Sequence, residues 1–194
     1  MITGTLDRRA AVRTLLQDRG DTLVITGLGS STYDTFAAGD HDANFYLWGA
    51  MGGAALMGLG LALAQPSRPV LVITGDGEQL MGLGGLVTIG VQKPRNLTIA
   101  VLDNGHFGET GMQPSHAGLG ADLVAIARSC GLTSVFDVRD EEGLIELRHA
   151  LQAQDGPRFA AIRIATGEHA RALAPRDGVH IRNRMRQHLG LPIM

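Results

Sequence analysis

The stretch that decides the fold is Val70-Leu71-Val72-Ile73-Thr74-Gly75-Asp76-Gly77-Glu78. Its first five residues are apolar or β-branched, which is typical of a buried strand, and the strand is expected to stop at Gly75. Glycines on both sides of Asp76 let the backbone approach a ligand closely while the carboxylate points outward. A helix is expected to start near Gln79, and its free N–H groups would favour a phosphate at the same place.

Apolar strands alternate with helices on both sides of this stretch. We expect helices at 6–19, 50–64, 79–91, 121–130 and 141–152, and strands at 22–26, 70–74, 97–102, 134–138 and 159–165. This alternation predicts an α/β fold with a doubly wound, mostly parallel sheet and helices on both faces. We take residues 1–194 as a single domain with a basic C-terminal helix at about 178–189. Ligands of such sheets bind beyond the carboxyl ends of the strands, so the expected loops 27–34, 75–79 and 103–120 are the candidate binding segments.

The composition is that of a soluble globular chain. A net charge of −2 gives no broad basic surface for nucleic acid or membrane, so neither partner is expected. The single cysteine, Cys130, excludes an internal disulfide framework, argues against an iron–sulfur site and is expected to be a buried thiol. The apolar run 50–64 is about 15 residues long and too short to cross a bilayer, and no secretory signal opens the chain. We therefore expect a cytoplasmic protein.

A second polar turn, Asp103-Asn104-Gly105, follows the next expected strand. Adjacent parallel strands end close together, so Asp76 and Asn104 are expected to converge on one ion. A carboxylate and an amide oxygen, completed by phosphate oxygens and water, suit Mg²⁺. Either motif alone would more often be an ordinary turn. The case for a site depends on both motifs following successive strands.

Gly75-Asp76-Gly77, followed after 25 residues by Asp103-Asn104, resembles the fingerprint of thiamine-diphosphate enzymes. Asp103 replaces the first Asn of the family pattern, whereas Asn104 keeps the second. The resemblance implies thiamine diphosphate and Mg²⁺ as cofactors, with the metal held by Asp76, Asn104 and the backbone oxygen of His106. It also places Gly75, Gly77, Glu78 and Phe107 against the cofactor.

The segment Trp48-Gly49-Ala50-Met51-Gly52 is similar to the family segment that receives the aminopyrimidine ring. By that resemblance, the Gly49 carbonyl accepts a hydrogen bond from the 4′-amino group. Met51 wedges between the two rings and enforces the V shape of the cofactor, so both residues count as catalytic. The alternative is that Met51 is a core residue at a helix start.

Further segments extend the resemblance over nearly the whole chain: 44–46, 109–114 and 176–179. They look similar to the small β subunit of sulfopyruvate decarboxylase and to the C-terminal half of phosphonopyruvate decarboxylase. The resemblance implies the cofactor-binding subunit of a heteromeric lyase that decarboxylates a small anionic 2-oxo acid. The alternatives are a carboligating or acyl-transferring enzyme of the same family, and a non-catalytic cofactor-binding module.

Enzymes of this family activate the cofactor through a Glu on a separate pyrimidine-binding domain. Because this chain has room for one domain, we expect that Glu to come from an α subunit. The resulting heteromer would contain at least two copies of each chain.

Several polar residues keep two interpretations. His116 could move protons above the thiazolium, or be a solvated loop residue. Glu109 could contact the substrate or the partner, and Glu78 is expected to form a local hydrogen bond at a helix start. Arg182 and Arg186 share a helix face, which is either solvated or a site for a second substrate anion. The hydroxyls of 30–32 are expected near the diphosphate or the substrate.

Overall fold

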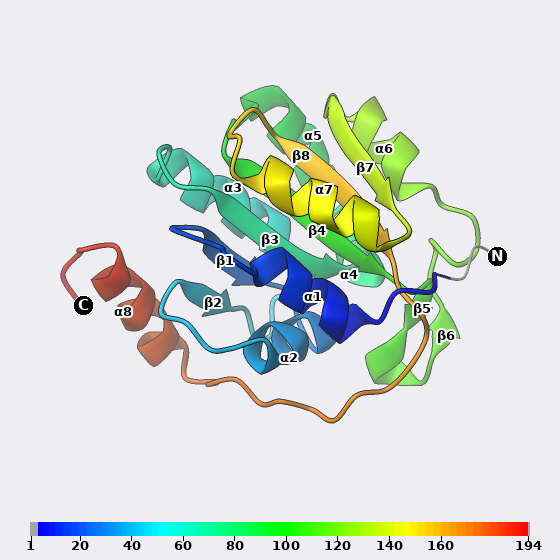
Figure 1. Ribbon diagram of the computed structural model, residues 1–194, viewed down its shortest axis with the longest axis horizontal. Coiled ribbons are helices and arrows are strands. Elements are labelled where there is room, and N and C mark those ends of the chain that lie inside the picture. Colours follow the sequence, from blue (N-terminus) through cyan, green and yellow to red (C-terminus); the bar gives the residue numbers. More distant parts are fainter. Residues whose placement is uncertain (1–3, 194) are drawn as a thin grey trace.

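A six-stranded, fully parallel sheet forms the centre of the computed structural model, which describes residues 4–193 (Figure 1). Its strands, in spatial order, are β2 (Asn44–Tyr46), β1 (Leu23–Thr26), β3 (Val70–Gly75), β4 (Leu97–Asp103), β8 (Arg158–Arg163) and β7 (Ser134–Val138). A small antiparallel pair, β5 (His106–Phe107) and β6 (Gln113–Pro114), lies beyond the end of β4. The chain leaves β1 toward the β2 edge and returns to β3 on the other side of β1, so the strand order reverses between β1 and β3.

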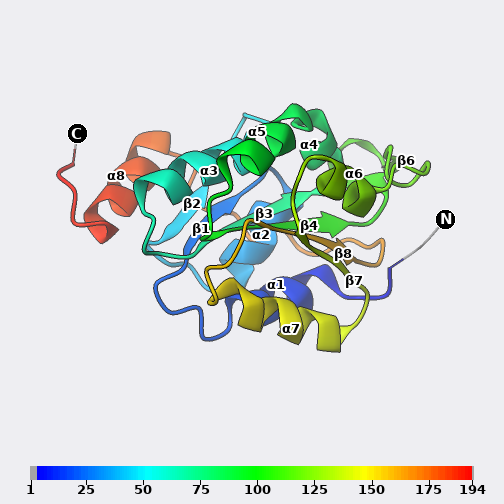
Figure 2. The same cartoon turned by 90° about the horizontal axis from the view of Figure 1, so that it is seen from above.

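Helices cover both faces of this sheet (Figure 2). One layer consists of α3 (Ala54–Ala64), α4 (Asp76–Met81), α5 (Gly84–Gln92) and α6 (Leu123–Ser129); the other consists of α1 (Arg8–Leu16), α2 (Ser30–Ala37) and α7 (Glu141–Leu151). A short 3-10 helix spans Gly108–Thr110, and α8 (Gly178–His188) lies beside β2 at one edge. The doubly wound α/β fold expected from the sequence is confirmed.

The two faces of the sheet form two separate cores. Val72 and Ile99 point toward the α3–α6 layer, whereas Leu71 and Ile73 point toward α1 and α7. All four side chains are fully buried. The central strands can be continuously apolar because both of their faces are covered. Among residues 4–193, no helix combines the length and the apolar character that a bilayer crossing needs.

Helix α2 was not anticipated, because its region was expected to be a loop. Its sequence, Ser-Ser-Thr-Tyr-Asp-Thr-Phe-Ala, contains residues with low helix propensity. Tertiary contacts stabilise it instead: the Thr32 hydroxyl donates to the Gly27 carbonyl at 2.7 Å, and the Asp34 side chain is fully buried. The three-residue strand β2 was missed because it is too short to show a pattern.

Two predicted helices have different boundaries. The helix expected at 79–91 is two helices, because the chain breaks at Gly82. A Cβ at Gly82 would lie 2.1 Å from the Gly52 carbonyl oxygen, so only glycine allows this approach. The helix expected at 50–64 begins at Ala54, which places Met51 in the preceding turn. Cys130 is partly exposed rather than buried.

Candidate functional site

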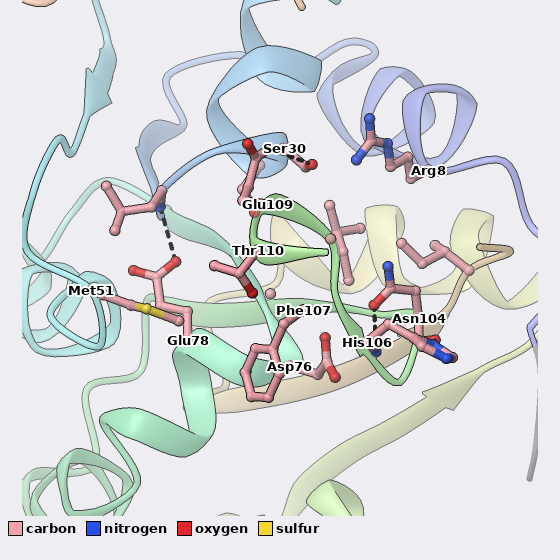
Figure 3. Close-up of a pocket in the computed structure, with 17 residues that line it drawn as sticks. Arg8, Ser30, Met51, Asp76, Glu78, Asn104, His106, Phe107, Glu109 and Thr110 are labelled. Atoms are coloured by element: carbon pink, nitrogen blue, oxygen red, sulfur yellow. Dashed lines mark hydrogen bonds between the residues drawn. The ribbon is translucent and has the colours of Figure 1, made fainter. Parts of the chain in front are cut away.

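A cavity of about 320 Å³ opens beyond the carboxyl ends of β1, β3 and β4, where the strand order reverses (Figure 3). This is the place where open α/β sheets bind ligands. Its lining comes from loops far apart in the sequence: Arg8, Leu28, Ser30, Ser31, Met51, Gly75, Asp76, Gly77, Glu78, Leu102, Asn104, His106, Phe107, Gly108, Glu109, Thr110 and Ile164. The three loops predicted to form the site therefore meet in one cavity.

Asp76 stands at the end of β3 and is the first residue of α4. The side chain is 3% exposed, and the Ser115 hydroxyl donates a hydrogen bond to its Oδ2. Burial raises the pKa of Asp76 to about 6, and the nearby Asp103 adds to the rise although the Ser115 hydrogen bond opposes it. A cation bound at Asp76 would stabilise the ionised carboxylate that burial disfavours.

Asn104 and His106 form a tight turn after β4. The His106 N–H donates to Asn104 Oδ1 at 2.9 Å, and His106 Nδ1 lies 2.8 Å from the Asn104 carbonyl oxygen. Asp103 forms an ion pair with Arg163 and accepts a hydrogen bond from the Gly105 N–H at 3.0 Å. Asp103, which stands where the family pattern has Asn, is thus held by its own turn and by β8.

The donors at this end of the cavity fit a hard divalent cation. Within residues 4–193, no three His, Cys, Asp or Glu side chains form a metal-binding cluster. A metal here would therefore depend on the Asp76 carboxylate together with neutral oxygens from Asn104, the backbone and a ligand. That donor set suits Mg²⁺, which commonly takes one or two carboxylates plus phosphate oxygens and water.

Gly75 and Gly77 have different surroundings. A Cβ at Gly75 would meet no atom within 4 Å, so this backbone borders open space in the cavity. A Cβ at Gly77 would lie 2.3 Å from Cε1 of Phe107. Gly77 therefore lets the Phe107 ring pack directly over the start of α4, where it forms part of the cavity wall.

Met51 lines the other end of the cavity and is 41% exposed, so it is not a core residue. The turn that presents it starts after Gly49, whose φ of 80° is in the region that favours glycine. Gly49 itself lies outside the cavity lining.

The prediction of a local hydrogen bond for Glu78 was wrong. Its Oε2 accepts from the Leu28 N–H at 3.0 Å, across 50 residues of sequence. Burial raises the pKa of Glu78. A Cβ at Gly27 would lie 1.8 Å from the same oxygen, so Glu78 occupies the space that a side chain there would need. Glu78 thus ties the loop after β1 to α4 and fixes one wall of the cavity.

The remaining predicted residues have different surroundings. His116 packs edge-on against Phe107, with ring centroids 6.4 Å apart, and lies outside the cavity lining. Glu109 lines the cavity and forms an ion pair with Arg171 at 3.1 Å. Arg182 and Arg186 lie on α8, away from the cavity lining.

Two residues of the site were missed in the sequence. Ser115 is fully buried beside Asp76, but it lies in a predicted loop and no spacing marks it. Arg8 lines the cavity from the start of α1, about 70 positions before the Gly-Asp-Gly turn. The α1 helix packs on the opposite face of the sheet from α4, so only the tertiary fold brings these parts together.

The chain matches known proteins over most of its length. Residues 28–162 match the family described as thiamine pyrophosphate enzyme, C-terminal TPP binding domain. Phosphonopyruvate decarboxylase of Streptomyces viridochromogenes is 40% identical over 82% of this chain, which spans 40% of that protein. Sulfopyruvate decarboxylase subunit beta of Methanothermobacter thermautotrophicus is 40% identical over 84% of this chain and 84% of its own length.

A solved structure gives the same result. The crystal structure of a candidate thiamin diphosphate-dependent enzyme isolated from Mycobacterium smegmatis superposes with a TM-score of 0.72 at 26% identity. The superposition covers 85% of this chain and 33% of the chain from Mycobacterium smegmatis. This chain therefore belongs to the thiamine pyrophosphate enzymes and contains their C-terminal TPP-binding domain.

Proposed function

We propose that this chain is the diphosphate-binding subunit of a heteromeric 2-oxo acid decarboxylase that acts on sulfopyruvate or phosphonopyruvate. The observation that carries the proposal is that Asp76, Asn104 and Met51 line the same cavity in a member of this cofactor family. The relatives of similar sequence are named for these two decarboxylations.

In this proposal, Asp76, the Asn104 side chain and the backbone oxygen of His106 hold Mg²⁺. The buried Asp76 carboxylate supplies the charge, and Ser115 orients it through the hydrogen bond to Oδ2. The Asn104 turn fixes the amide oxygen and the His106 backbone relative to each other. A cation at this point neutralises a diphosphate and fixes its position in the cavity.

The residues that would hold the diphosphate are Gly75, Gly77 and those at the start of α2. Gly75 borders open space, so ligand oxygens can approach its backbone closely. Gly29 precedes α2 without a side-chain cap, which leaves N–H groups of the first turn available near Ser30 and Ser31. Glu78 and Phe107 complete the walls.

Met51 and Gly49 position the rings of the cofactor. Met51 lies at the end of the cavity opposite Arg8, where the rings extend from an anchored diphosphate (Figure 3). The exposed Met51 side chain is available to pack between the two rings and enforce their bend, while the Gly49 carbonyl accepts the 4′-amino hydrogen bond. When bound, thiamine diphosphate supplies the electron sink for decarboxylation.

Proton transfer by His116 stays a prediction. Its ring packs against Phe107, which lines the cavity, and His116 itself lies outside the cavity lining.

An exposed apolar face on α3, α4 and α5 supports the proposal of a partner chain. This apolar face consists of Leu56, Leu63, Met81, Val87 and Val91, whose exposed fractions run from 44% to 73%. The contact between α3 and α5 brings exposed apolar side chains onto one helix layer, and such surfaces are typical of protein–protein interfaces. We propose that a pyrimidine-binding α subunit covers it and supplies the activating Glu, in an assembly with at least two copies of each chain.

The test is reconstitution of the full chain with a co-purifying or co-encoded α subunit, followed by kinetics on sulfopyruvate, phosphonopyruvate and pyruvate. We expect no turnover by either chain alone. The pair should prefer one of the two dianionic acids over pyruvate by about 100-fold or more in kcat/KM. Equal use of pyruvate would contradict the substrate assignment. Products in which an acyl group joins a second carbonyl, with no preference for simple decarboxylation, would favour carboligation.

A further inference from the structure

Arg8 is a cationic side chain that the proposed function leaves without a role. It lies at the start of α1 and lines the main cavity. It also lines a smaller polar pocket of about 90 Å³ beside it, together with Ser30 and Asn104. In Figure 3, the side chain extends from α1 toward Ser30, on the far side of the cavity from Met51.

A buried carboxylate fixes the position of Arg8. The Arg8 Nε lies 3.1 Å from Asp34 Oδ2, and the Arg9 Nε lies 2.9 Å from the other oxygen of the same carboxylate. The Asp34 side chain is fully buried, whereas that of Arg8 is 11% exposed. Asp34 therefore holds two guanidinium groups, and the three side chains together carry a charge of +1.

The two arginines differ in what their terminal nitrogens contact. Arg9 donates from Nη2 to the Ala170 carbonyl at 2.8 Å, outside both pockets. Within residues 4–193, Arg8 pairs with Asp34 alone, and its terminal nitrogens have no hydrogen-bond partner. Arg8 thus presents an unused, largely desolvated guanidinium edge to the cavity.

The acidic residues of the cavity do not neutralise this edge. Asp76 accepts from Ser115, and Glu78 accepts from Leu28. Glu109 pairs with Arg171 through Oε2 and accepts from the Ser30 hydroxyl through Oε1 at 3.4 Å. An anion that pairs with Arg8 must therefore come from a ligand.

We propose that Arg8 binds the terminal phosphate of thiamine diphosphate. The proposal rests on the proposed placement of the cofactor, with its rings at Met51 and its metal at Asp76. The outer phosphate then lies at the opposite end, where Arg8 and Ser30 face the cavity. A guanidinium forms bidentate, charge-assisted hydrogen bonds with phosphate, and the ion pair with Asp34 keeps the Arg8 guanidinium at this end of the cavity.

The test compares two ligands that differ only in the terminal phosphate. Mg²⁺-dependent binding of thiamine diphosphate and of thiamine monophosphate to the assembled complex of this chain with its α subunit is measured by calorimetry. Arg8→Met should weaken the binding of thiamine diphosphate by about 10- to 100-fold and the binding of thiamine monophosphate by less than about 3-fold. Arg9→Met is the matched control, because it removes the neighbouring charge and an Asp34 contact but no cavity-lining group. It should change neither affinity by more than about 3-fold.

Arg8→Lys keeps the charge without the planar guanidinium. Its affinity for thiamine diphosphate should therefore lie between those of the original chain and Arg8→Met, and should fall further as the salt concentration rises. This variant decides the question if Arg8→Met does not fold. Equal losses for both ligands, or an unchanged affinity for thiamine diphosphate, would overturn the assignment of Arg8. An unchanged cofactor affinity with a higher KM for the 2-oxo acid would place Arg8 at the substrate instead. Failure of the unsubstituted complex to bind either ligand would contradict the cofactor site itself.

Discussion

Ser115 donates a hydrogen bond to Asp76 at the wall of the cavity, although 39 residues separate the two in the chain. Both side chains are buried, and burial still raises the pKa of Asp76 to about 6 despite this donor. The site therefore holds a carboxylate that the folded chain does not fully stabilise by itself. In the proposed function a magnesium ion supplies the missing stabilisation.

The first prediction concerns stability without metal. Between about pH 4 and pH 6, folded Asp76 keeps a proton that the unfolded chain has lost, so the free energy of unfolding falls as pH rises through this window. The amide in Asp76→Asn cannot ionise, so the free energy of unfolding of this variant should not show this decrease. We expect it to be more stable than the original chain by about 1–3 kcal/mol near pH 8, and nearly equal near pH 4. Urea unfolding with a chelator measures this. Parallel pH profiles for the two chains would show that Asp76 is not the group responsible.

The second prediction concerns Met51. Met51→Leu keeps the volume of the side chain and should be tolerated. Met51→Ala should let the rings relax from the bent arrangement, which lowers kcat of the assembled enzyme by about 10- to 100-fold. The affinity for the cofactor should change little, because the diphosphate contacts stay in place. If Met51→Ala left kcat unchanged, the wedge role would be wrong.

The third prediction concerns the apolar face. Val87 is 54% exposed on α5, and Val87→Arg places a charge where the proposed partner packs. We expect the affinity for the α subunit to fall by about 10-fold or more while thermal stability is kept. Ile145→Arg is the control, since Ile145 is 45% exposed on α7 in the opposite helix layer. Equal effects of the two substitutions would locate the interface elsewhere.

The sequence predicted the parts of the fold that carry strong local patterns. The apolar strands and the two polar turns at Asp76 and Asn104 were found, because continuous apolar runs and polar residues next to glycine are local patterns in the sequence. Helix α2 was missed because its Ser and Thr residues disfavour a helix until burial and the Thr32–Gly27 hydrogen bond stabilise it.

The site was predictable where its residues follow the ends of predicted strands, or where, as for Met51, they belong to a segment that resembles the family. Ser115, Arg8 and the Leu28–Glu78 hydrogen bond depend on segments that meet through the tertiary fold. A serine after a proline and an arginine at a helix start are common on protein surfaces, so neither one indicates a site by itself.

The most direct test of the central claim is calorimetry of thiamine diphosphate with Mg²⁺, on the original chain in its complex and on Asp76→Ala. The account predicts that Asp76→Ala removes Mg²⁺-dependent binding and keeps the fold, because it deletes the only charged protein ligand proposed for the metal. Asn104→Ala should reduce the cofactor affinity less, because it removes only a neutral oxygen. As a control, substitution of the exposed Asp21 by alanine should leave the affinity unchanged. Unchanged affinity in Asp76→Ala would contradict the assignment of this cavity as the cofactor site.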